Sequence, residues 1–180
     1  MTARGGDVSG EVARLIVVVG RPGTGKTTLA RALSERLGAM YLRVDAVEAA
    51  LRRVQGHDPG VAGYAVVHEL AEANLRLGRD VVVDAVCPVP EARGSWVVTA
   101  AAAGAEVTVL VTHLPDDREH ERRVTQRRPD LAGQHVPTWP EVRAARWEPW
   151  DRARDGPSTE VDTTSSGAAL ERALRVLGQT

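Results

Sequence analysis

The residues with the clearest chemical potential form one short stretch near the N-terminus. Gly20 to Thr27 reads Gly-Arg-Pro-Gly-Thr-Gly-Lys-Thr, which matches the phosphate-binding pattern G-x-x-x-x-G-K-[ST] at every defined position. Glycines at this spacing let successive backbone N–H groups surround a phosphate at the start of a helix, where the helix dipole also favours an anion. The sequence therefore predicts a nucleotide-phosphate site formed by Gly20, Arg21, Pro22, Gly23, Thr24, Gly25, Lys26, Thr27 and Thr28.

Lys26 is the only lysine in the 180 residues, and the other basic residues are arginines (23 − 1 = 22). A slim ammonium on a flexible stem can enter a pocket of N–H groups and touch two phosphates, whereas a broad planar guanidinium cannot. We therefore expect Lys26 to bridge the β- and γ-phosphates of ATP. The Thr27 hydroxyl is expected to ligate Mg²⁺.

Two carboxylates follow short apolar stretches and are candidates for the reaction centre. Asp84 closes the run Val-Val-Val-Asp and is predicted to orient Mg²⁺, directly or through water, with an ordinary polar strand end as the alternative. Ala85 follows it where an ATPase motor would place a glutamate to polarise water, which favours transfer over hydrolysis. Asp45 is predicted at the end of the strand next to the loop. It could orient a substrate hydroxyl and accept its proton, or it could be the N-cap of a helix beginning at Ala46.

Arginines in the C-terminal half could complete the site. Arg123 and Arg127 are four residues apart in a predicted helix over 115–128, so both could point from one helix face into a cleft. Closing over ATP, they would stabilise the transferring phosphoryl group and exclude water, and Arg128 could share this role. The alternative is a solvated helix face whose charges pair with neighbouring carboxylates.

Several other side chains have two interpretations each. Arg52 and Arg53 could bind an anionic part of a substrate or lie on the plain surface. Trp139, Trp147 and Trp150 could fill core space or form a wall for a flat acceptor, Trp96 is expected in the core, and Cys87 could line the acceptor pocket or act as a small hydrophobe.

The chain alternates predicted strands and helices. Strands are predicted over 15–19, 40–44, 81–84, 107–112 and 159–162, and helices over 29–37, 46–54, 61–77, 90–103, 115–128 and 167–177. This alternation predicts a three-layer α/β fold with a five-stranded parallel sheet. Because ligands of such sheets bind at the carboxyl ends of the strands, we expect the loop and both carboxylates to meet there.

The composition of the chain limits the number of domains, the kinds of partner and the cellular location that we expect. A 180-residue chain that is 43% hydrophobic fits one domain over 1–180, with 1–13 as a loose tail and 114–133 as a lid region. A net charge of −1 provides no global field for nucleic acid or membranes. The single cysteine excludes an internal disulfide, scattered histidines make catalytic zinc unexpected, and the apolar run 15–19 is far too short for a membrane span, so we expect a cytoplasmic protein.

The motifs also resemble a known group. The stretch from Gly20 to Leu33, with Leu37-Gly38-Ala39 and the strand before Asp45, resembles the opening of small P-loop kinases related to shikimate, gluconate and adenylate kinases. Gly78 to Asp84, Arg123 to Arg127 and Glu160 to Thr164 are similar to chloramphenicol phosphotransferase and the kinases grouped with it and zeta toxins.

The resemblance runs from about residue 14 to the end, but 132–158 departs from the group's pattern and leaves the substrate open. It implies a P-loop NTPase fold of the nucleoside-monophosphate-kinase type with a helical lid. It also implies that Asp45 is the catalytic base and that Arg123 and Arg127 belong to a mobile lid over ATP.

The expected function is ATP-dependent transfer of the γ-phosphoryl group to a hydroxyl of a small molecule, for example an antibiotic or another natural product. The first alternative is a nucleoside or nucleotide kinase or a 5′-hydroxyl polynucleotide kinase. The second is a nucleotide-dependent regulatory module, for which Pro22 to Thr27 is also typical. The expected partners are a nucleoside triphosphate and a small hydroxyl acceptor, without membrane or nucleic acid, and the oligomeric state is left open.

Overall fold

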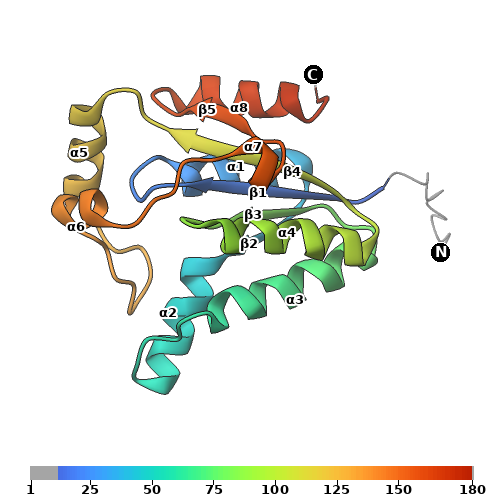
Figure 1. The fold of residues 1–180 in the computed structure, drawn as a ribbon, viewed down its shortest axis with the longest axis horizontal. Helices are drawn as coiled ribbons and strands as arrows, with labels where there is room; N and C mark the ends of the chain where they lie inside the picture. Colours follow the sequence, from blue (N-terminus) through green and yellow to red (C-terminus); the bar gives the residue numbers. More distant parts are fainter. Residues whose placement is uncertain (1–11, 180) are drawn as a thin grey trace, which may run out of the picture.

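The computed structural model describes residues 12–179, so residues 1–11 of the predicted loose tail lie outside the described part. Five parallel strands form one sheet in the order β2-β3-β1-β4-β5, drawn in Figure 1. They are β1 (Arg14–Gly20), β2 (Met40–Arg43), β3 (Val81–Asp84), β4 (Glu106–His113) and β5 (Thr159–Asp162). The predicted five-stranded parallel sheet is confirmed.

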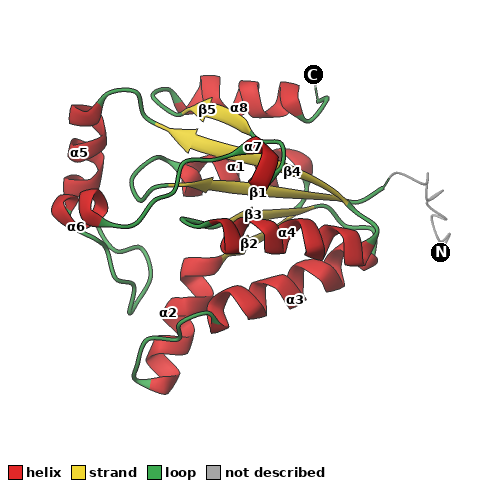
Figure 2. Ribbon diagram, in the orientation of Figure 1, coloured by secondary structure: helices red, strands yellow, loops and turns green. Residues whose placement is uncertain are grey.

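Helices cover both faces of the sheet (Figure 2). They are α1 (Lys26–Leu37), α2 (Val44–Gln55), α3 (Ala62–Arg76), α4 (Pro90–Ala103), α5 (Asp117–Gln126), α6 (Trp139–Ala144), α7 (Arg152–Asp155) and α8 (Ser166–Val176). None of these helices in residues 12–179 is long and apolar enough to cross a bilayer.

The central strand β1 divides the core by alternation of its side chains. Leu15 and Val17 pack with residues of α3 and α4 on one face, whereas Ile16 and Val18 pack with residues of α1 and α8 on the other. All four side chains are fully buried. A continuous β-branched run is what a strand with two covered faces requires, so β1 holds the loop that follows it on a rigid support.

Glycines end two of the helices that the sequence predicted. Gly38 after α1 and Gly104 after α4 have φ values of 64° and 65°, the left-handed conformation that a side chain disfavours. Helices α6 and α7 were not expected from the sequence. The signal for α6 was present, since Thr138 and Glu141 form a capping box at its start.

Two predicted positions are wrong in detail. Helix α2 begins at Val44, with Arg43 as its N-cap, so Asp45 lies in the first helical turn and is neither a strand end nor a cap. Strand β3 lies between β2 and β1, so the strand next to the loop ends in Asp84.

Helix α5 is shorter than predicted. It ends at Gln126, and Arg127 has an extended backbone with ψ of 132°. Residue 129 is proline, and the residue before a proline is pushed away from helical conformation. Arg123 and Arg127 therefore do not share a helix face.

Candidate functional site

The loop between β1 and α1 has a backbone that only glycine accommodates. Gly20, Gly23 and Gly25 have φ values of 152°, 86° and 84°. A Cβ atom on Gly20 would lie 2.3 Å from Thr112 Oγ1 and 2.6 Å from the Thr112 carbonyl oxygen. The loop is thus packed against β4, which fixes its shape before any ligand arrives.

Helix α1 begins directly after this loop without a side-chain cap. Gly25 is its N-cap residue and offers no hydrogen-bonding side chain. The N–H groups of the first turn are therefore left for an anion, in the direction that the helix dipole favours. Loop and helix together form the phosphate cradle that the sequence predicted.

Lys26 is buried in this cradle, with 7% of its surface exposed. Its Nζ donates a hydrogen bond to the Arg21 carbonyl oxygen at 3.1 Å. Burial lowers the pKa of Lys26, while the nearby carboxylates of Asp84 and Asp45 act in the opposite direction. A buried ammonium with a single neutral acceptor is ready to exchange that acceptor for phosphate oxygens.

Asp84 and Thr27 meet as the sequence predicted. The Thr27 Oγ1 hydroxyl donates to Asp84 Oδ2 at 2.6 Å, and the Tyr41 hydroxyl donates to the same oxygen at 3.1 Å. Burial and the Asp84 carboxylate raise the pKa of Tyr41, so its hydroxyl stays a donor.

The oxygens of Thr27 and Asp84 are hard donors of the kind that Mg²⁺ takes. Among residues 12–179 there is no group of three or more His, Cys, Asp or Glu side chains placed to hold a metal ion. Mg²⁺ usually keeps several waters and binds through few protein oxygens together with substrate phosphates. The residues present therefore fit the ion.

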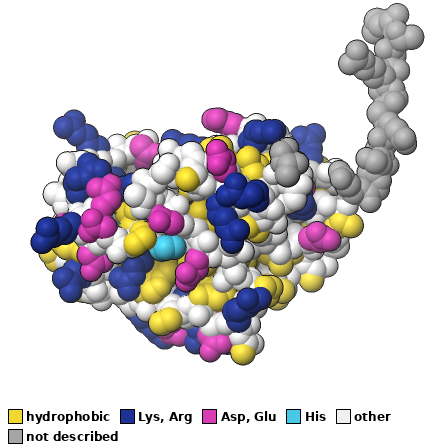
Figure 3. Space-filling view, turned by 90° about the horizontal axis from the view of Figure 1, so that it is seen from above, with side chains coloured by type: hydrophobic (Ala, Val, Ile, Leu, Met, Phe, Trp, Pro, Cys, Tyr) yellow, Lys and Arg dark blue, Asp and Glu magenta, His cyan; other side chains and the backbone are white. Residues whose placement is uncertain are grey.

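A cavity of about 630 Å³ opens at the start of α1. Among the described residues, its wall contains seven cationic side chains, Lys26, Arg31, Arg43, Arg122, Arg123, Arg127 and Arg128, and one carboxylate, Asp130. On the face drawn in Figure 3, acidic and basic side chains are interspersed. Positive charge is thus concentrated at this cavity although the net charge of the chain is −1.

The two predicted lid arginines both line this cavity but act on different partners. Arg123 Nε pairs with Glu119 at 2.6 Å, and its Nη atoms donate to the carbonyl oxygens of Thr163 and Thr164 at 3.0 Å each. Arg127 Nη2 lies 3.8 Å from Asp45 Oδ2. The ion pair of Arg123 with Glu119 is one that the alternative interpretation expected, and Arg122 pairs with the same carboxylate at the surface.

Asp45 is held by three side chains. Its Oδ2 accepts hydrogen bonds from Arg43 Nη2 and Gln134 Nε2, each at 3.2 Å, beside the longer contact to Arg127. Neither Asp45 nor Asp84 belongs to the cavity wall, but they contact the wall residues Arg43 and Thr27. Asp84 thus lies against the phosphate cradle at Thr27, and Asp45 lies behind the cavity wall at Arg43.

Sequence reasoning missed two residues that organise this region. Arg43 is 5% exposed at the end of β2 and contacts both carboxylates; an arginine two positions before Asp45 was the available signal. Thr163 Oγ1 lies 2.6 Å from the Thr24 carbonyl oxygen, and its Cβ would be 3.3 Å from a Cβ on Gly25. Only the tertiary structure brings Thr163 to the loop.

Other predicted side chains have structural partners. The Arg21 guanidinium donates to the Val142 carbonyl oxygen at 3.1 Å and lies 5.5 Å from the Trp147 ring centroid, so this side chain leaves the cavity. Arg53 and Arg52 donate to the carbonyl oxygens of Ala132 and Gly133. Both helix arginines are thus directed to the main chain of the segment after α5.

Trp96 is buried in the core, as predicted, and its indole N–H donates to Cys87 Sγ at 3.3 Å. Cys87 is fully buried and has a φ of 49°, which is uncommon for a residue with a side chain. Burial raises the pKa of its thiol to about 11. The interpretation of Cys87 as a small hydrophobe is therefore the one that the structure favours.

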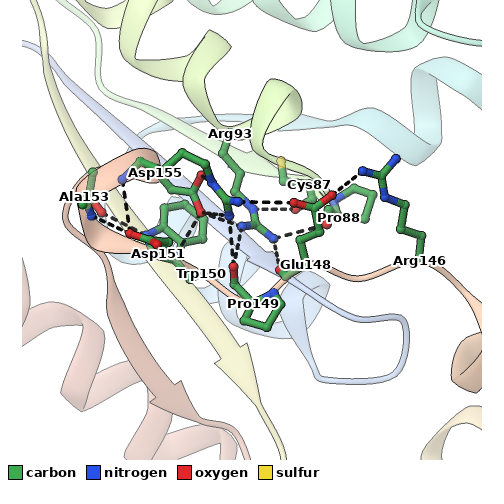
Figure 4. A network of polar contacts seen from close by, with 12 residues as sticks. Cys87, Pro88, Arg93, Arg146, Glu148, Pro149, Trp150, Asp151, Ala153 and Asp155 are labelled. Carbon is green, nitrogen blue, oxygen red and sulfur yellow. Dashed lines mark hydrogen bonds and ion pairs between the residues drawn. The ribbon is translucent and has the colours of Figure 1, made fainter.

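A buried arginine fastens the segment after α6 to the loop after β3 (Figure 4). Arg93 pairs with Asp155 at 2.7 Å and donates to carbonyl oxygens on both segments. The rings of Trp150 and Trp147 lie 4.9 and 5.8 Å from its guanidinium carbon. Trp139, Trp147 and Trp150 are half-buried, so they only partly fill core space.

The fold and this cradle define a P-loop nucleotide-binding α/β domain. Over residues 15–157 the sequence matches the AAA domain family AAA_33, and the chain belongs to this family. Among curated proteins, none matches the sequence.

Solved structures share the fold over nearly the whole chain. A sugar kinase from Janibacter sp. HTCC2649 has a TM-score of 0.66 and 19% identity, covering 92% of this chain and 95% of that chain. Chaetomium thermophilum Kti12 with ADP-AlF3 has a TM-score of 0.63 and 19% identity, covering 91% and 97%. The Mycobacterium tuberculosis APS kinase CysC with AMPPNP and APS has a TM-score of 0.58 and 19% identity, covering 92% and 96%.

These likenesses confirm the predicted P-loop fold. The resemblance to small P-loop kinases is supported at the level of the fold. The closer similarity to chloramphenicol phosphotransferase is not confirmed.

Proposed function

We propose that the protein is an ATP-dependent kinase that transfers the γ-phosphoryl group to a hydroxyl of a small molecule. The observation that carries this proposal is the position of Asp84 against the phosphate cradle at Thr27 and of Asp45 against the cavity residue Arg43, together with Ala85 where a hydrolytic enzyme would place a glutamate. A sugar kinase and an APS kinase share the fold, which supports phosphoryl transfer without identifying the acceptor.

Each residue of the site has one task in this proposal. Lys26 and the first-turn N–H groups of α1 bind the phosphates. Arg123 and Arg127 place positive charge beside the transferring phosphoryl group, where negative charge spreads over its oxygens in the transition state. Thr27 and Asp84 would hold Mg²⁺, which neutralises phosphate charge when bound.

Asp45 acts on the acceptor. It orients the hydroxyl and takes its proton as the oxygen attacks the γ-phosphorus. The new bond joins the acceptor oxygen to phosphorus, the bond from phosphorus to the β,γ-bridging oxygen breaks, and ADP leaves with that electron pair. The lid residues exclude water, which would otherwise compete with the acceptor.

The test is an acceptor screen with ATP and Mg²⁺, followed by phosphorus NMR of the product. Three acceptor sets distinguish the possibilities: hydroxylated natural products including antibiotics and sugars, nucleosides and their monophosphates, and 5′-hydroxyl oligonucleotides. We expect phosphorylation in the first set, abolished in Lys26→Ala and retained in the exposed surface variant Arg36→Gln. Phosphorylation confined to oligonucleotides, or ATP binding without any acceptor, would overturn the proposal.

A further inference from the structure

One buried guanidinium contacts three carboxylates from three parts of the chain. The side chain of Arg43 is 3% exposed. Its Nη1 and Nη2 donate to the two oxygens of Asp130 at 2.7 and 3.1 Å, and Nη2 also donates to Asp45 at 3.2 Å. Its Nε lies 3.6 Å from Asp84 Oδ2. Arginine suits this position because its planar fork presents donors in several directions at once.

The contacts close into a ring. The Asp130 backbone N–H donates to Gln134 Oε1 at 3.3 Å, and Gln134 Nε2 donates to Asp45 Oδ2 at 3.2 Å. Arg43 thus joins Asp45 to Asp130 directly, and Gln134 joins them a second time. Asp130 and Gln134 both belong to the segment after α5, which also covers the cavity through Arg127 and Arg128.

Helix α2 holds the same segment from its other end. Arg53 Nη1 donates to the Ala132 carbonyl oxygen at 2.5 Å, and Arg52 Nη1 donates to that of Gly133 at 3.4 Å. Gly133 has a φ of 78°, and a Cβ there would lie 3.1 Å from Arg53 Cγ. The segment 127–134 is therefore seated on the first and last turns of α2, the helix that carries Asp45.

The ring contains one unsatisfied group. Arg43 Nε is buried and has no hydrogen-bond partner among residues 12–179, although Asp84 Oδ2 is only 3.6 Å away. A buried charge with an unpaired donor is costly. A shift of a few tenths of an ångström would bring Nε within hydrogen-bond distance of Asp84 Oδ2. The position of the Arg43 guanidinium is therefore sensitive to its contacts with Asp130 on one side and Asp84 on the other.

We propose that Arg43 is a positioning residue that couples closure of segment 127–134, through Asp130, to the orientation of Asp45 and Asp84. Of the described residues that line the cavity, Asp130 is the one carboxylate, and there it opposes phosphate binding. We expect Asp130 instead to hold segment 127–134 in the closed position through Arg43. When the segment opens, Arg43 loses its strongest partner and the orientation of Asp45 relaxes.

This inference rests on the proposed kinase function, and the first test does not need it. Hydrogen exchange measured by mass spectrometry on Asp130→Asn and Arg43→Lys should show faster exchange in 127–134, with the sheet unchanged. Glu171→Gln, which removes one carboxylate of an exposed pair on α8, should match wild type. Unchanged exchange in 127–134 in both variants would overturn the proposal even if no acceptor is ever found.

The second test uses the acceptor found in the screen. Asp130→Asn should lower kcat by about 10- to 100-fold, because a small misplacement costs that much, while the Kd for ATP stays equal or tightens. The double variant with Arg43→Lys should be no slower than Arg43→Lys alone, since both changes break one linkage. Multiplying losses, or an equal loss of ATP affinity and kcat, would assign both residues a structural role instead.

Discussion

The Asp45 carboxylate contacts three donors through Oδ2, and its proposed role is to take the proton of the acceptor hydroxyl. In Asp45→Asn the amide keeps the size of the side chain but cannot take a proton. We expect transfer to fall by about 10²- to 10⁴-fold, the range for loss of a general base, with the Kd for ATP within about threefold of wild type. Steady-state kinetics and equilibrium nucleotide binding measure the two quantities.

Asp130→Asn and Asp45→Asn also differ in their expected exchange behaviour. Asp130 accepts from Arg43 through both carboxylate oxygens, so the amide of Asp130→Asn replaces one acceptor with a donor that faces the guanidinium. Asp45 accepts through Oδ2 alone, and the amide of Asp45→Asn keeps one such oxygen, so segment 127–134 should stay protected. Loss of ATP affinity in parallel with turnover in Asp45→Asn would mean that the carboxylate holds the cradle together rather than acting on the acceptor.

A second residue-scale prediction concerns Cys87. Burial raises the pKa of its thiol to about 11, so at pH 8 the reactive thiolate is scarce as well as covered. We expect maleimide labelling of the native protein to be at least about 100-fold slower than labelling in urea. Rapid labelling without denaturant would place Cys87 in an open acceptor pocket.

At the scale of elements, Arg93 and its partners behave as a clamp between α4 and the segment around α7. The ion pair with Asp155 is completely enclosed, at 0% and 1% side-chain exposure. Arg93→Gln removes the positive charge that offsets the buried Asp155 carboxylate. We therefore expect a decrease of about 3–5 kcal/mol in the free energy of unfolding. Urea denaturation measures it.

The matched control for the clamp is Arg146→Gln. Arg146 pairs with Glu148 in the same segment but is 74% exposed, and such pairs contribute about 0–1 kcal/mol. Equal destabilisation by the two changes would show that burial of Arg93 does not decide its contribution.

Elements that carry strong local signals were predictable from the sequence. Strand β3 and helix α4 begin and end where their valine run, proline and glycine place them. The phosphate loop and the contact between Thr27 and Asp84 followed from a motif and from the parallel sheet. Helix α7 escaped prediction because it is only four residues long and depends on its Asp151 cap and the buried Asp155.

The parts that could not be predicted depend on contacts between distant residues. The start of α2 at Val44 moved Asp45 from a strand end into a helix, and Pro129 ended α5 before Arg127. In the ring, Arg43 and Asp130 are 87 residues apart in the sequence, and Asp45 and Gln134 are 89 residues apart. A local sequence pattern does not indicate such long-range contacts, whereas the geometry of the phosphate loop is determined by eight consecutive residues.

Across the whole molecule the net charge is small, at −1, and positive charge is concentrated at one cavity. A change in pH should therefore alter stability through particular groups rather than through general repulsion.

Glu48 should contribute a decrease in stability as the pH rises towards 7. Burial, together with the nearby Asp45 carboxylate, raises its pKa from 4.5 to about 7, against the opposing effect of Arg52, while Asp58 adds to the rise. The folded state therefore holds a proton that the unfolded state has released between these two values. The free energy of unfolding should fall as pH rises from about 4.5 to about 7 and stay lowered above it.

Glu48→Gln replaces the titrating carboxyl with an amide that does not take up or release a proton in this pH range. We expect its melting temperature to exceed that of wild type at pH 8 and to match it at pH 4, because at pH 4 the wild-type carboxyl is protonated in the folded state. Glu35→Gln, at an exposed position on α1, should follow the wild-type profile. If Glu48→Gln follows that profile as well, the packing of Glu48 against Gly63 contributes more to stability than its charge does.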